Sequence, residues 1–107
     1  MNVLFICSRN QWRSPTAEKV FQTYEGFTCR SAGTSDKARI KVNAKLLEWA
    51  DLIFVMEKKH KQILISTYGT LVREKELYVL DIPDEYGYMD EELIQMLETS
   101  VSPLLYT

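Results

Sequence analysis

Two short apolar runs constrain the fold of this chain more than any other feature. Asn2–Cys7 and Asp51–Met56 are almost continuously apolar and rich in β-branched or aromatic residues. A strand with one face in water alternates apolar and polar residues, whereas a continuous run indicates a strand that is buried on both faces. Both runs are far shorter than the roughly 20 residues of a membrane-spanning helix. They predict the inner strands of a parallel sheet covered by helices.

The rest of the chain alternates between helical and extended patterns. Ser14 is a suitable N-cap, and Pro15 suits the first helical position. Apolar residues then recur at helical spacing, so residues 15–24 are expected to form an amphipathic helix. The other expected elements, in chain order, are a strand at 27–31, a helix at 43–50 capped by Asn43, a helix at 57–65, a strand at 77–80 and a helix that begins after the cap Asp90.

This order predicts the fold class. Strands that alternate with helices form a parallel sheet, and right-handed connections place helices on both faces. We therefore expect residues 1–107 to form one α/β domain, a small doubly wound three-layer domain with a four-stranded parallel sheet. Ligands of such sheets bind at the carboxyl ends of the strands. The segment that follows the first strand is therefore the place to look for chemistry.

Charge and cysteine content exclude several classes of protein. Residues 1–45 contain eight Lys and Arg against three Asp and Glu, whereas residues 46–107 contain five against twelve. The basic first half suits an anion, but the net charge of −2 does not suit a general nucleic-acid binder. Two cysteines and one histidine cannot complete a four-ligand zinc site. The N-terminus lacks the basic start of a signal peptide. We expect a cytoplasmic monomer without metal, cofactor or membrane contact.

The segment after the first strand has the pattern of a phosphate-binding loop. A cysteine at the strand end is followed by five residues, an arginine, a serine and a helix. A cysteine thiol near a helix N-terminus and a cation is more acidic than a free thiol, and an arginine fork can hold two phosphate oxygens. The turn can point successive N–H groups at the anion, and the serine hydroxyl can donate to the thiolate. The candidate site residues here are Cys7, Ser8, Arg9, Asn10, Gln11, Trp12, Arg13 and Ser14.

In its motifs the chain resembles the low-molecular-weight protein tyrosine phosphatases. The likeness covers residues 3–18, continues at 31–34 and 50–56, and ends at 84–86. It implies a metal-independent phosphomonoesterase with a phosphocysteine intermediate, acting on phosphorylated proteins. The implied roles are nucleophile for Cys7, phosphate clamp for Arg13, thiolate partner for Ser14, loop shaping for Asn10 and general acid for Asp84.

The chain departs from the family pattern at three places around the loop. Arg9 replaces a glycine, and Trp12 replaces a cysteine that precedes the arginine in many members. After residues 31–34 the family usually has a longer stretch that supplies an aromatic wall of the pocket. This chain continues almost directly into residues 36–39, so a more open site is expected.

Several alternatives are open at this point. A phosphate-binding module without turnover fits the same loop. The loop also resembles that of phosphoserine phosphatases that act on the RNA polymerase II tail, in which an Asp-Ile-x-Asp stretch similar to residues 81–84 carries the acid. Arsenate reductase is disfavoured because no cysteine follows Cys29.

Single residues outside the loop also have alternative interpretations. Asp81 competes with Asp84 as the acid, and Tyr86 is expected to line the pocket. Lys37, Arg39 and Lys41 form either a basic rim or a solvated loop. His60 is expected on a solvated helix face and Cys29 in the core.

Overall fold

The computed structural model describes residues 1–106 and contains a four-stranded sheet. All neighbouring strands are parallel, and the spatial order is β2-β1-β3-β4. The strands are β1 (Asn2–Cys7), β2 (Thr28–Gly33), β3 (Leu52–Val55) and β4 (Glu76–Val79). The expected four-stranded parallel sheet and three-layer α/β class are therefore confirmed.

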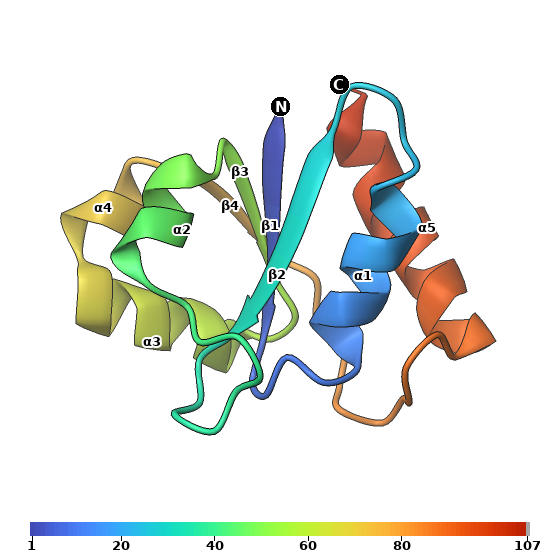
Figure 1. Cartoon of the computed structure of the whole chain (residues 1–107), viewed down its shortest axis with the longest axis horizontal. Helices are drawn as coiled ribbons and strands as arrows, with labels where there is room; N and C mark the ends of the chain where they lie inside the picture. Colours follow the sequence, from blue (N-terminus) through green and yellow to red (C-terminus); the bar gives the residue numbers. More distant parts are fainter. Residues whose placement is uncertain (107) are drawn as a thin grey trace.

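Helices cover both faces of the sheet (Figure 1). On one face lie α1 (Arg13–Phe21) and α5 (Glu91–Leu105). The opposite face is covered by α2 (Ala44–Trp49), α3 (Lys58–Tyr68) and α4 (Thr70–Arg73). Within residues 1–106, no helix combines the length and the hydropathy that crossing a membrane requires.

Strand β1 explains why the apolar runs are continuous. Alternate residues of a strand point to opposite faces. Val3 and Phe5 pack in the core beneath α1 and α5, while Leu4 and Ile6 pack in the core beneath the other three helices. All four side chains are fully buried, so every position of the strand interior must be apolar.

Two helices begin at caps that the sequence predicts. The Asn43 side chain accepts a hydrogen bond from Leu46 N at 2.9 Å at the start of α2. The Asp90 carboxylate accepts from Glu92 N at 2.9 Å and caps α5. These contacts satisfy N–H groups that have no partner inside the helix.

The first helix does not begin as expected. Trp12, not Ser14, is the N-cap of α1, because the Ser14 hydroxyl contacts the Cys7 sulfur instead of capping the helix. The helix therefore begins at Arg13 and ends at Phe21. A second difference is α4, a short additional helix that follows Gly69.

The strand order places the carboxyl end of β1 at the centre of one sheet edge. The chain leaves β1 towards β2 and later crosses to β3 on the other side, so β1 lies at the point where the strand order reverses. Such a switch point is the usual ligand site of doubly wound sheets. The loops after β1, β2, β3 and β4 all meet at this edge, at the lower end of the view in Figure 1.

Candidate active site

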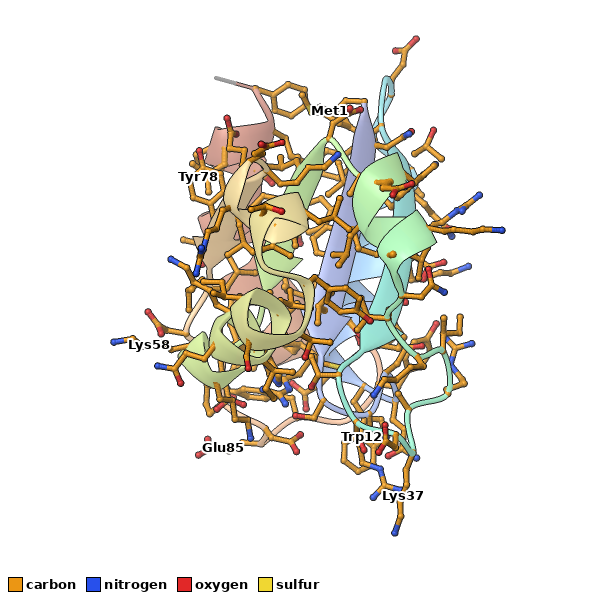
Figure 2. All side chains as sticks on the ribbon, turned by 90° about the vertical axis from the view of Figure 1, so that its left-hand side faces the viewer. Met1, Trp12, Lys37, Lys58, Tyr78 and Glu85 are labelled. Atoms are coloured by element: carbon orange, nitrogen blue, oxygen red, sulfur yellow. The ribbon has the colours of Figure 1, made fainter. Side chains whose placement is uncertain are left out.

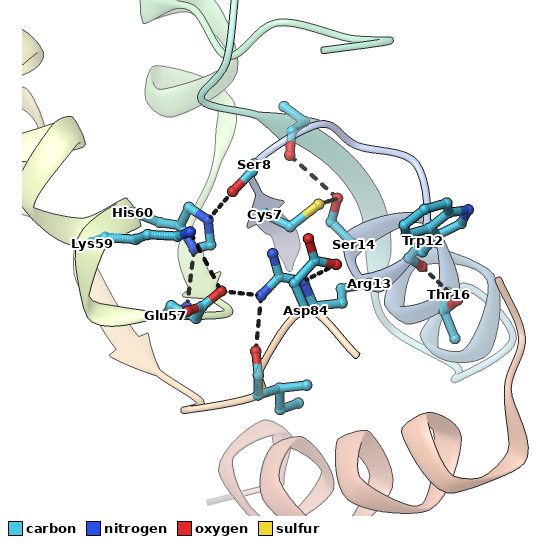
Figure 3. A network of polar contacts seen from close by, with 12 residues as sticks. Cys7, Ser8, Trp12, Arg13, Ser14, Thr16, Glu57, Lys59, His60 and Asp84 are labelled. Carbon is cyan, nitrogen blue, oxygen red and sulfur yellow. Dashed lines mark hydrogen bonds and ion pairs between the residues drawn. The ribbon is translucent and has the colours of Figure 1, made fainter. Parts of the chain in front are cut away.

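The loop between β1 and α1 surrounds the Cys7 thiol. Cys7 is the last residue of β1, and its side chain is buried at the base of the loop. Its Sγ lies 3.0 Å from the Ser14 Oγ (Figure 3). A hydroxyl at this distance can donate to a thiolate and stabilise its negative charge. The pair predicted from the sequence is therefore brought into contact.

Four consecutive N–H groups of this loop have no acceptor. Within residues 1–106, the backbone N–H groups of residues 8–11 donate to no protein atom. Successive N–H groups without partners form a concave nest for an anion. The nearby N-terminus of α1 adds the positive end of a helix dipole.

A buried polar network holds the loop from inside the protein. Asn10 adopts φ 56°, a left-handed conformation that asparagine tolerates better than most residues. Its Nδ2 donates to Ser14 Oγ and to Ser31 Oγ, both at 2.9 Å. These three polar residues are almost fully buried. Asn10 therefore ties the loop to both α1 and β2.

Arg13 is fixed in one orientation beneath the loop. Its side chain is only 2% exposed, and Nη1 donates to Glu57 Oε1 and, at 2.9 Å, to the carbonyl oxygen of Ile82 (Figure 3). Burial raises the pKa of Glu57, but the hydrogen bond and charge of Arg13 outweigh it, so the pKa lies below its ordinary value. A charged Glu57 therefore holds the guanidinium through Nη1.

His60 belongs to the same network, and the prediction of a solvated position was wrong. The side chain is fully buried, with Nδ1 accepting from Glu57 N at 3.0 Å and Nε2 lying 2.8 Å from Ser8 Oγ. A backbone N–H can only donate, so the proton is on Nε2 and points to Ser8. Burial and then the charge of Arg13 lower the pKa of His60 to about 4.

The sequence contains a pattern that predicts a buried His60, but the neighbouring lysines made it hard to recognise. Glu57 and His60 form a capping box at the first turn of α3, and Leu64 is buried one turn later. The spacing i, i+4 of His60 and Leu64 marks the inner face of the helix. The surrounding lysines concealed this pattern, because they lie on the solvent side of the same turn.

The two candidate acids occupy different hollows. Asp84 is 54% exposed, and its Oδ1 lies 3.7 Å from Arg13 Nε. Asp81 instead lines a separate hollow with Glu57 and Pro83. It has φ 56°, and this left-handed kink follows β4 just before Ile82, whose carbonyl accepts from Arg13.

Six of the predicted site residues line one small cavity of about 30 Å³. Ser8, Asn10 and Ser14 support the loop through the contacts described above. Trp12 is 46% exposed at the mouth. Tyr86 is half-buried against the core beneath α1 and α5, and it does not line the cavity. The lining residues are Cys7, Arg9, Gln11, Trp12, Arg13 and Asp84.

The fold and this loop define a class, a doubly wound α/β domain with a buried cysteine at the base of a loop of free N–H groups. Comparison with known proteins gives the family. The family model described as low molecular weight phosphotyrosine protein phosphatase matches residues 2–48. The low molecular weight protein-tyrosine-phosphatase Ptp of Acinetobacter johnsonii is 30% identical over 133 aligned positions, which cover 94% of this chain and 93% of that protein. The chain belongs to the low molecular weight protein-tyrosine-phosphatase family.

Two further similarities concern one bacterium. A protein-arginine-phosphatase of Bacillus subtilis is 33% identical over 96 aligned positions, and the match covers 64% of this chain and 64% of that protein. The crystal structure of a YwlE mutant from Bacillus subtilis has a TM-score of 0.76 and 25% identity, and the match covers 100% of this chain and 99% of that one. Relatives with two named substrate classes are therefore similar to this chain.

Proposed function

We propose that this protein is a metal-independent phosphomonoesterase that works through a phosphocysteine intermediate, and that it is a protein tyrosine phosphatase. The observation that carries the proposal is the convergence of Cys7, Arg13 and Asp84 on one cavity. The loop offers free N–H groups to the phosphoryl oxygens, and the buried guanidinium adds a fixed positive charge.

The first chemical step transfers the phosphoryl group to sulfur. The Cys7 thiolate attacks phosphorus, the bond between phosphorus and the substrate oxygen breaks, and Asp84 gives its proton to that oxygen. Ser14 stabilises the thiolate before the attack through the 3.0 Å contact with Sγ.

The second step regenerates the enzyme. Water attacks the phosphocysteine, the sulfur–phosphorus bond breaks, and the Asp84 carboxylate accepts the proton that water loses. Asp84 is better placed than Asp81 for both transfers, because it lines the cavity that contains Cys7.

The proposed substrate is a phosphorylated protein. The phosphoryl group would bind in the cavity lined by Cys7 and Arg13, and the remainder of a phosphotyrosine would lie against the exposed ring of Trp12. The second candidate substrate is protein phosphoarginine, because of the similarity to the arginine phosphatase of Bacillus subtilis. We place the activity in the cytoplasm, in a monomer, and we propose that residues 1–107 fold as one domain.

The decisive test is hydrolysis of a chromogenic aryl phosphate in the presence of a metal chelator. The wild type should turn over, and Cys7→Ser should lose turnover but still bind orthovanadate or phosphate, because the loop N–H groups and Arg13 remain. Substantial activity in Cys7→Ser would refute the phosphocysteine mechanism. Oxyanion binding without wild-type turnover would instead identify a non-catalytic phosphate-binding module.

The substrate class needs a separate comparison. Matched peptides that carry phosphotyrosine, phosphoarginine or phosphoserine are compared by kcat/KM with the wild type. A preference for phosphotyrosine supports the proposal, and a preference for phosphoarginine supports the second candidate. A preference for phosphoserine overturns both.

A further inference from the structure

The outer side of the phosphate loop is bound by the segment that follows β2. Thr34 N donates to the carbonyl of Cys7 at 3.0 Å, and Ser35 N donates to that of Ser8 at 2.9 Å. Arg39 N then donates to the carbonyl of Arg9 at 3.0 Å. Three consecutive carbonyls of the loop are thus held by one short segment, residues 34–39, which we call the brace.

The next carbonyl in the loop is held by a side chain. Arg39 Nε donates to the carbonyl oxygen of Asn10 at 3.2 Å. Asn10 has a left-handed backbone conformation, which is uncommon for a residue other than glycine. Such a conformation persists only when surrounding contacts hold it in place. Of the brace contacts on the loop, this is the one made by a side chain, and it can be removed by substitution.

The carbonyls and the anion-binding N–H groups are coupled by peptide geometry. A trans peptide unit is planar, so its C=O and the following N–H point in opposite directions. When the carbonyls of residues 7–10 point outward to the brace, the N–H groups of residues 8–11 point the other way. These are the N–H groups without a protein acceptor in the described structure.

We propose that Arg39 is a positioning residue that sets the oxyanion affinity of the phosphate loop by holding the Asn10 carbonyl. This inference rests on one part of the proposed function, namely that the loop binds an oxyanion. Arg39 does not line the cavity and acts on the ligand through the loop. The brace therefore has a binding role in this chain, where the family usually has a longer segment with a pocket wall.

Simple charge is the competing explanation for any effect of Arg39. Arg39 is exposed and lies two residues after Lys37, which is also exposed and lies at the end of the molecule opposite Met1 (Figure 2). Either cation could attract an anion through space. Lys37 is a matched control, because the hydrogen bonds of the described residues include none from its side chain to the loop.

The experiment separates the hydrogen bond from the charge by three variants. In Arg39→Gln the amide nitrogen lies the same number of bonds from the backbone as Arg Nε, so the donor is kept and the charge is lost. Arg39→Met loses both, and Lys37→Met loses a charge without losing a contact with the loop. The dissociation constant of orthovanadate, kcat and KM for an aryl phosphate, and Tm are measured for each full-length protein.

We expect Arg39→Met to weaken orthovanadate binding about three- to tenfold, the range for loss of one ordinary hydrogen bond. Arg39→Gln should recover most of that loss, and Lys37→Met should bind like the wild type. Because the contact is a single, partly buried hydrogen bond at the surface of the loop, Tm should change little. The loss should persist at high salt, which screens interactions between exposed charges.

Two results would overturn the inference. One is equal weakening in Arg39→Gln, Arg39→Met and Lys37→Met, which would assign the effect to charge. The other is wild-type binding in Arg39→Met. Failure of the proposed function has a different result. If the wild type binds orthovanadate without turnover, the proposed enzymatic activity is wrong. The dissociation constants of the Arg39 variants then still decide the role of the brace. A wild type that binds no oxyanion refutes both.

Discussion

The two sides of the candidate site are built very differently. On the phosphate side, Cys7, Asn10, Arg13 and Ser14 are all at most 3% exposed, and the loop that carries them is bonded on its inner and outer sides. On the acid side, Asp84 is 54% exposed and lies in residues 80–90, which form neither helix nor strand. The contacts of this segment include two backbone hydrogen bonds from Leu80 N and Ile82 N to the end of β3 and the 2.9 Å bond from Met89 N to Thr16 Oγ1.

This contrast assigns different tasks to the two sides. Fixed N–H groups and a fixed guanidinium can bind an oxyanion without rearrangement at the moment of reaction. An exposed carboxylate can exchange protons with solvent and adjust to leaving groups of different size. Substitutions on the phosphate side should therefore change oxyanion binding, and substitutions on the acid side should change sensitivity to the leaving group.

The largest expected effect tests the acid side. Asp84→Asn should lower kcat about 10²- to 10⁴-fold on a substrate with a poor leaving group, because a positioned acid contributes about that much. The loss should be much smaller with a good leaving group, and the basic limb of the pH–rate profile should flatten. Orthovanadate binding should remain close to that of the wild type.

Asp81→Asn is the matched control for this prediction. Asp81 has the same side chain three residues earlier but lines a different hollow, so its variant should show no dependence on the leaving group. Since asparagine also tolerates the left-handed conformation at this position, the backbone should be preserved. Leaving-group sensitivity in Asp81→Asn and not in Asp84→Asn would move the acid to Asp81.

The sequence predicted one side of the site better than the other for a physical reason. Residues 7–14 are consecutive, so strand, loop and helix signals fixed their relative positions before any tertiary contact was known. The contacts of Asp84 depend instead on how residues 80–90 pack against α1 and the Arg13 side chain. Sequence patterns therefore left Asp81 and Asp84 as alternatives, which the structure separates by the cavity each one lines.

The second prediction concerns Arg13. Arg13→Lys keeps the charge but loses the planar guanidinium. In the wild type this group contacts Glu57 and Ile82 and at the same time lines the cavity. We expect kcat/KM to fall about 10²- to 10³-fold, the usual cost of removing one preorganised donor, and orthovanadate binding to weaken. Near-normal kinetics would show that Arg9, which also lines the cavity, holds the phosphate instead.

Residues that support the loop from a distance were the hardest to predict. His60 lies 52 positions from Ser8, and Arg39 lies 29 positions from Asn10, so no local pattern links either pair. Both side chains are polar residues in charged surroundings, for which a solvated position is the ordinary expectation. The four strands, in contrast, were predictable from local patterns, two of them from continuous apolar runs, and no strand end differs from its expected position by more than two residues.

The third prediction compares one glycine on each side of the site. A Cβ on Gly33 would lie 2.4 Å from the Ser8 carbonyl oxygen, whereas a Cβ on Gly87 would meet nothing within 4 Å. Gly33→Ala should therefore lower the free energy of unfolding by about 1–3 kcal/mol, the usual cost of overpacking, and weaken orthovanadate binding by displacing the loop. Gly87→Ala should change neither, as measured by urea unfolding and by titration. Equal behaviour of the two variants would contradict the contrast between the two sides.

The smallest expected effect concerns His60 and depends on pH. An unfolded histidine has its ordinary pKa of 6.5, and burial in the folded protein lowers the pKa of His60 to about 4. Above pH 6.5 the ring is neutral in both states, and its full contribution to stability is present. As pH falls from 6.5 towards 4, the unfolded chain binds a proton that the folded protein does not, so the free energy of unfolding decreases.

Comparison of His60→Gln with the wild type separates the effect of His60 protonation on stability from the other effects of pH. Glutamine at the third residue of a helix can complete a capping box as His60 does with Glu57, but it does not titrate. Urea unfolding of both proteins at pH 7 and pH 5 should therefore show a smaller loss of stability in the variant. An imidazolium would also have no lone pair for Glu57 N, so orthovanadate binding by the wild type should weaken at pH 4 relative to the variant. An equal loss of stability in the two proteins between pH 7 and pH 5 would show that His60 is protonated as readily in the folded as in the unfolded chain, and that this part of the phosphate side is open to solvent.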